Sequence, residues 1–187
     1  MIANLVAGFV GASTAAATDY ESIQTVTVGA AQATVTFSSI PSTYTHLQVR
    51  IMGRATAATV EDQLIYRING DTGANYAFHI LYGSGSGSPV AQGYANETSI
   101  IPAARVAGSS AASGIYGVGI VDILDYANTN KFKTTRCLNG VDRNGAGTVY
   151  ISSGLWRNTS AVTSLSFTVQ AGGNIDQYSS FALYGIK

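Results

Sequence analysis

The chain has 187 residues and a mass of 19.3 kDa, and its ten Lys and Arg balance ten Asp and Glu, so the formal net charge is zero. Only 11% of residues are charged, against about 25% in typical soluble domains. This balance disfavours a basic nucleic-acid-binding protein and a polybasic membrane-surface protein. The 46% of apolar residues disfavours disorder. A weakly charged surface tends to associate, which favours a protein that works inside an assembly.

Residues 1–19 contain an apolar run that belongs to no strand pattern. No Lys or Arg precedes this run, and the first basic side chain is Arg50, which argues against a signal peptide. The run is also short and glycine-rich for a bilayer span. It either folds back as an edge strand or extends as an arm that buries its apolar side chains on a neighbouring subunit, and we favour the arm. The side chains that we expect to anchor it are Leu5, Val6, Phe9 and Val10.

From Tyr20 onward the hydrophobic pattern has a period of two, which is typical of half-buried strands. Residues 46–51 and 164–170 alternate cleanly between apolar and polar. Residues 115–124 are apolar on both faces, which predicts a strand in the centre of a packed sheet. Further strands are expected over residues 22–28, 33–37, 63–68, 77–82, 132–138, 148–152 and 181–186.

Turn residues separate these strands. Asn69-Gly70 and Asn139-Gly140 predict hairpin turns, and residues 83–89 and 103–113 predict long loops. No window shows a convincing amphipathic helix, and residues 125–130 are the best short candidate. About ten short strands without a linker predict a single all-β, antiparallel β-sandwich over residues 20–187, preceded by the arm. A jelly roll is the natural topology at this length.

The sequence offers no convergent set of catalytic or metal-binding groups. His46 and His79 lack metal-ligand spacing, and residues 83–88 imitate a serine nucleophile turn but have Gly85 at its centre. Residues 69–73 are rich in oxygen ligands but lack the spacing of a calcium loop, so we interpret them as a plain turn. The single cysteine, Cys137, is expected to be buried in a strand. We therefore predict that the chain is not an enzyme and needs no cofactor or metal.

Two sets of side chains remain as candidates for surface contacts. Tyrosine combines a rigid apolar ring with a polar tip and favours interfaces and sugar-binding surfaces as well as cores. The basic side chains Lys131, Lys133, Arg136 and Arg143 cluster in sequence, and we expect a solvated strand face or intersubunit salt bridges rather than a nucleic-acid site. The tyrosines that flank expected loops are Tyr76, Tyr82, Tyr94 and Tyr116.

Several segments of the sequence resemble a widespread family of bacteriophage virion proteins that are often labelled tail-fibre or hypothetical structural proteins. The likeness covers about residues 20–187 and consists of strand and turn segments without a catalytic signature. It implies a virion component with a β-sandwich or jelly-roll domain. The segments that carry it are residues 37–47, 67–76, 125–129, 153–156, 158–162 and 181–186.

The leading expectation is a capsid decoration, or cement, protein on the virion surface. Such a protein would form a homotrimer, bind the major capsid protein and stabilise the shell, with no nucleic acid or membrane partner. The alternative is a tail-fibre or baseplate protein whose loops and tyrosines bind a host surface receptor or glycan. A glycan-degrading enzyme is a third class, but it needs a carboxylate pair that the sequence does not offer.

Overall fold

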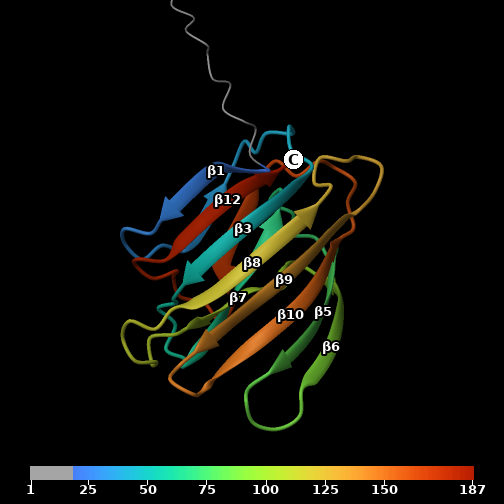
Figure 1. Ribbon diagram of the computed structural model, residues 1–187. Coiled ribbons are helices and arrows are strands. Elements are labelled where there is room, and N and C mark those ends of the chain that lie inside the picture. The colour runs from blue at the N-terminus through green and yellow to red at the C-terminus, as the bar shows by residue number, and fades with distance from the viewer. Residues whose placement is uncertain (1–18) are drawn as a thin grey trace, which may run out of the picture.

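Antiparallel strands make up the regular structure of residues 19–187, which are the residues that a computed structural model describes. They form two sheets packed face to face (Figure 1). No helix in this part of the chain is long and apolar enough to cross a membrane. The twelve strands are β1 (Tyr20–Thr27), β2 (Thr34–Phe37), β3 (His46–Gly53), β4 (Glu61–Ile68), β5 (Tyr76–Gly83), β6 (Val90–Glu97), β7 (Ile100–Ala107), β8 (Gly117–Leu124), β9 (Lys133–Asp142), β10 (Gly147–Trp156), β11 (Leu165–Val169) and β12 (Ser180–Ile186).

The strand order is that of a widened jelly roll. The larger sheet has the order β1-β12-β3-β8-β9-β10-β5-β6, and the smaller sheet has the order β2-β11-β4-β7. The first four strands of the larger sheet, β1-β12-β3-β8, form one four-stranded half of a jelly roll, and the smaller sheet forms the other half. The hairpins β5–β6 and β9–β10 are inserted into this frame and extend the larger sheet to eight strands (Figure 1). The predicted antiparallel β-sandwich is confirmed.

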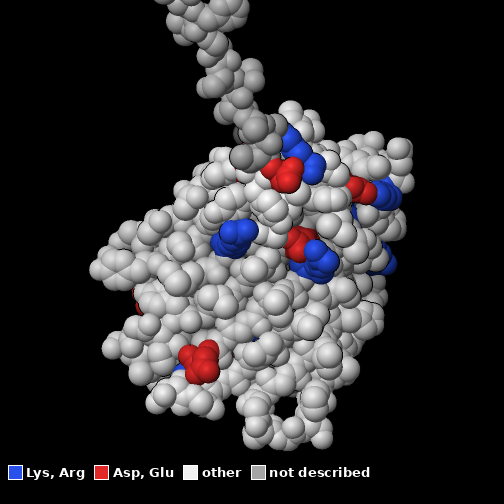
Figure 2. Space-filling model, in the orientation of Figure 1, with Lys and Arg blue, Asp and Glu red and all other residues white. Residues whose placement is uncertain are grey.

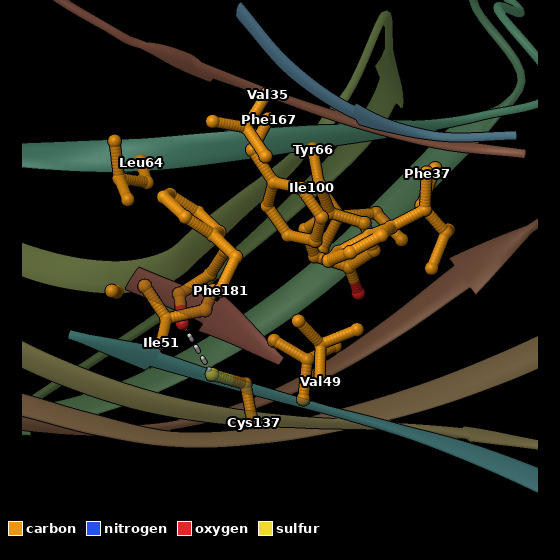
Figure 3. Close-up of a cluster of buried hydrophobic side chains, with 14 of the residues drawn as sticks. Val35, Phe37, Val49, Ile51, Leu64, Tyr66, Ile100, Cys137, Phe167 and Phe181 are labelled. Atoms are coloured by element: carbon orange, nitrogen blue, oxygen red, sulfur yellow. Dashed lines mark hydrogen bonds between the residues drawn. The ribbon is translucent and has the colours of Figure 1, made fainter. Parts of the chain in front are cut away.

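The core lies between the two sheets and is centred on aromatic rings (Figure 3). Phe167 on β11 is fully buried, and its ring centroid lies 5.9 Å from that of Tyr66 and 5.4 Å from that of Phe181. The predicted burial of Cys137 is confirmed, and its thiol donates to the carbonyl oxygen of Ala103 at 3.1 Å. Burial raises the pKa of this thiol to about 12, so it stays protonated at neutral pH.

The predicted loop over residues 103–113 is wrong in its first half, because residues up to Ala107 belong to β7. Small residues occur there because the strand packs very close to the larger sheet. A Cβ atom on Gly117 would lie 1.8 Å from the carbonyl oxygen of Arg105, and one on Gly119 would lie 2.2 Å from that of Ala103. The small residues that are typical of a loop therefore occur here because they allow a close contact between the backbones of two strands.

The predicted turn at Asn139-Gly140 is also wrong, because both residues lie inside β9. Asn139 is buried, and its side-chain oxygen accepts a hydrogen bond of 3.0 Å from the backbone N–H of Arg105. The chain reverses four residues later, where Asn144 and Gly145 take positive φ angles of 66° and 91°. Residues 125–130 form a turn rather than a helix.

Candidate functional site

The inserted hairpin β9–β10 buries several polar side chains among its apolar ones and exposes several apolar side chains on its outer face. On β9, Thr135 and Asn139 are buried, while Leu138 between them is 56% exposed. The buried polar groups are satisfied, since the Tyr66 hydroxyl donates to Thr135 Oγ1 at 2.7 Å and Asn139 accepts from β7. In a sheet that packs on a core, the exposed face usually carries polar side chains. The outward side chains are therefore the unusual feature of the hairpin.

Exposed apolar side chains occur on five adjacent strands of the larger sheet, which are β3, β8, β9, β10 and β5. Ile120 on β8 pairs with Leu138, Leu138 pairs with Ile151 on β10, and Ile151 pairs with Leu81 on β5. A second row begins with Met52 on β3 opposite Val118 on β8. Patches of exposed apolar side chains of this extent mark interaction sites in soluble proteins. We call this surface the apolar face, and its side chains, each 40–61% exposed, are Met52, Leu81, Val118, Ile120, Leu138, Val149 and Ile151.

A groove of about 870 Å³ runs over the apolar face. Gly140 pairs with both Val118 and Val149, and Val149 pairs with Gly83, so short side chains and glycines alternate along this row. No atom lies within 4 Å of the position that a Cβ atom on Gly83 would take, so this part of the groove is open. The groove is bordered by Tyr116, by residues 83–85 and by the β9–β10 turn.

Few charges interrupt this side of the molecule, as Figure 2 shows. Arg50 and Asp142 border the groove. Arg50 lies over the ring of Tyr184, 4.9 Å from its centroid. Asp122 and Arg136 form an ion pair of 2.8 Å on β8 and β9. Arg50 pairs with Ile120, so the first apolar row ends at this charge on β3, whereas the centre of the face around Leu138 and Val149 is uncharged. A partner surface that matches this centre is apolar and neutral.

One predicted surface tyrosine is misplaced, because Tyr76 is fully buried. Its hydroxyl accepts from the Ile68 N–H at 3.0 Å and donates to the carbonyl oxygen of Asp71 at 3.1 Å. These bonds tie β5 to the end of β4 and to the turn after it. Tyr76 is therefore a core residue and is not available for surface contacts.

Tyr82 and Tyr94 lie on the inner face of the β5–β6 hairpin, which the larger sheet carries beyond the smaller one. Tyr82 stacks on Tyr150 with 4.6 Å between ring centroids, and Tyr94 stacks on Phe78 at 4.7 Å. Tyr82 is half-buried and Tyr94 is exposed. Three of the four candidate tyrosines thus belong to the β5–β6 hairpin, and two of them, Tyr82 and Tyr94, are accessible there.

Tyr116 stands apart from the other tyrosines. It borders the groove, and its hydroxyl donates to the carbonyl oxygen of Gln177 at 2.8 Å.

The predicted arm anchors fall outside the described residues 19–187. They are Leu5, Val6, Phe9 and Val10.

The basic side chains that cluster in sequence separate in the fold. Arg143 pairs with Glu61 at 2.9 Å, at the opposite end of β9 from Lys131, which pairs with Asp125. Burial opposes ionisation of Glu61, but hydrogen bonds from Arg105, Arg143 and Thr148 outweigh it and lower its pKa. The expected solvated face is present only in part, because Lys133 is fully buried.

The oxygen-rich turn after β4 is a structural turn. Asp71 accepts hydrogen bonds from the indole N–H of Trp156 at 2.7 Å, from the Asn75 amide at 2.9 Å and from the Gly73 N–H at 2.8 Å. Asn69 takes a positive φ of 52° and Gly70 one of 65°, as a tight turn requires. Within residues 19–187 no three His, Cys, Asp or Glu side chains gather in a group suited to a metal ion.

One strand of the apolar face has a pattern in the sequence that the structure explains differently from our expectation. Residues 115–124 are apolar on both faces, and we expected both faces to be covered. The inner side chains, such as Val121, are buried, but the outer ones, Val118 and Ile120, stay exposed. A strand that is apolar on both faces therefore also occurs where one face packs on the core and the other is a docking surface.

Comparison of the chain with protein-family models, with curated proteins and with solved structures finds no match.

Proposed function

We propose that the protein is a structural subunit of a bacteriophage virion, and specifically a decoration protein that binds the major capsid protein and stabilises the shell. The single observation that carries the proposal is the apolar face, on which seven exposed side chains lie side by side. Covering these side chains with a partner removes them from water and stabilises the contact by about 25 cal/mol for each Å² buried. A subunit of an assembly presents such a surface.

The role is mechanical. Packing of the genome strains the shell, and a bound decoration protein adds contact area where shell subunits meet. Individually weak contacts become strong when several copies are linked, because each further contact is then intramolecular. The near-neutral charge of the chain removes long-range repulsion between copies that crowd on one surface.

Quantitative mass spectrometry of purified virions of the encoding phage tests this proposal. The measured quantity is the number of copies of this chain relative to the major capsid protein. Hundreds of copies per particle are expected for a decoration protein. Absence from the particle would overturn the proposal.

A tail-fibre or baseplate role is the second candidate, and the tyrosines of the β5–β6 hairpin favour it. Tyr82 and Tyr94 present aromatic rings beyond the edge of the smaller sheet, where a glycan or a receptor loop can reach them. A handful of copies per virion, in multiples of three or six, supports this role. In that case Tyr82→Ala and Tyr94→Ala variants are expected to lose binding to host cells, whereas a Tyr178→Ala variant, changed at another exposed tyrosine, keeps it.

A further inference from the structure

We propose that the groove on the apolar face binds residues 1–18 of a second copy of this chain. The proposal goes beyond the virion role, because it concerns the contact between copies and is testable without any particle. It names the segment that covers the exposed side chains lining the groove, Val118, Ile120, Leu138 and Val149. Met52, Leu81 and Ile151 do not line the groove and remain available for the capsid contact.

The chemistry of the two surfaces matches. Residues 1–18 contain no Asp, Glu, Lys or Arg. The centre of the groove, around Leu138 and Val149, is also uncharged, and its charged neighbours stand at the border. An apolar segment that enters the groove therefore leaves no buried charge unpaired. The segment side chains large enough to fill it are Leu5, Val6, Phe9 and Val10.

The register of the sheet indicates that the segment comes from a second copy. Tyr20, the first residue of β1, pairs with Ile186, which pairs with His46, at one end of the larger sheet. The groove is level with the other end of β1, because Thr27 pairs with Ser180, Ser180 with Met52, and Met52 with Val118. The residue at which the segment joins the sheet, Tyr20, therefore lies at the opposite end of the sheet from the groove of its own chain.

The length of the segment suits a contact between copies. Eighteen residues span up to roughly 60 Å when extended, which exceeds the length of an eight-residue strand by a wide margin. The contact joins two different surfaces, the segment of one copy and the groove of the next. A contact of this head-to-tail kind closes into a ring or continues into a filament. The homotrimer expected from the sequence is the smallest closed ring beyond a pair.

Sedimentation of the purified full chain at micromolar concentrations tests the contact. The wild-type chain is expected to sediment as a closed oligomer. Leu138→Lys places a charge in the groove and is expected to give monomers. Thr134→Lys is the matched control, because Thr134 is exposed on the same strand and the same face, one row beyond Arg136, and this variant is expected to remain oligomeric. A monomeric wild-type chain would overturn the proposal.

A mixing experiment shows which copy supplies the segment. One variant carries Leu138→Lys and keeps an intact segment, and the other carries Leu5→Ser, Val6→Ser, Phe9→Ser and Val10→Ser and keeps an intact groove. Each is expected to be monomeric alone, and the mixture is expected to give a one-to-one heterodimer, because one working segment meets one working groove. A mixture that stays monomeric, or a serine variant that still forms the wild-type oligomer, would contradict the proposal.

Discussion

Ile120 and Ile123 lie three residues apart on β8, so their side chains are on opposite faces of the larger sheet. Ile123 is fully buried in the core between the two sheets, whereas Ile120 is 40% exposed on the apolar face. The same residue type on one strand thus contributes to the fold in one case and to a surface in the other.

Truncation of these two side chains shows which of them stabilises the folded chain. Ile123→Ala is expected to lower the free energy of unfolding by about 2–5 kcal/mol, because it leaves a cavity in the core. At dilutions where the chain is monomeric, Ile120→Ala is expected to cost about 1 kcal/mol or less, because its side chain is then partly in water. Urea unfolding of both variants measures the difference. Equal losses would show that the apolar face is part of the core.

Acidification is expected to weaken the turn that Asp71 organises. Partial burial opposes ionisation of Asp71, but hydrogen bonds from Trp156, Asn75 and Gly73 outweigh it and hold its pKa below 3.8 in the folded chain. The ionised form is therefore favoured by folding, so its contribution to stability is present above the unfolded pKa and is lost as the pH falls through the folded pKa.

An Asp71→Asn variant isolates this contribution from those of other carboxylates. The wild-type chain is expected to be more stable than the variant at pH 7, and the gap is expected to narrow as the pH falls below about 4. Thermal unfolding at a series of pH values measures the gap. A gap that is independent of pH would show that the charge of Asp71 does not matter.

Lys133 is expected to be a structural lysine. Its fully buried ammonium group donates to the carbonyl oxygens of Lys131 and Thr159 at 3.0 Å and to that of Asn128, which ties the loop after β8 to the loop after β10. Lys133→Met leaves these oxygens without their donor and is expected to cost on the order of 2 kcal/mol of stability. Lys131→Met, in the exposed neighbour, is the control and is expected to change stability by less than about 0.5 kcal/mol. An equal effect of both variants in chemical unfolding would argue against the structural role.

Deletion of residues 2–18 is expected to leave the domain folded, because residues from Val28 onward form a large buried core within the described part of the chain. The melting temperature of the deleted chain should equal that of the full chain at dilutions where both are monomeric. Its binding to virions should be lost, because single copies then lack the avidity of a linked oligomer. Unchanged binding to particles would show that this segment is not needed for assembly.

The fold was predictable from the sequence wherever one face of a strand is buried. The alternation in residues 46–51 and 164–170 corresponds to β3 and β11, and the expected antiparallel sandwich follows from it. The sequence pattern does not predict β6 or β7, and the reasons are physical. β6 packs little on the core, so it shows no alternation, and β7 uses Ala103 and Ala104 where the sheets approach closely.

The candidate site was harder to predict than the fold. Exposed apolar residues such as Leu138 and Ile151 are indistinguishable in sequence from core residues. The sequence pattern shows which side chains are apolar, but it does not show whether another sheet covers that face of the strand. The sequence pair Asn139-Gly140 is typical of a turn, but Asn139 is buried and hydrogen-bonded in β9. Only the three-dimensional pairing of β8, β9, β10 and β5 brings the apolar side chains together.

Capsids that lack this protein provide the most direct test of the proposed role. Purified full chain is added to such particles, and both its binding and the temperature of genome release are measured. The wild-type chain and Thr134→Lys are expected to bind and to raise the release temperature, whereas Leu138→Lys is expected to bind weakly and to leave it unchanged. A wild-type chain that does not bind these particles would contradict the account.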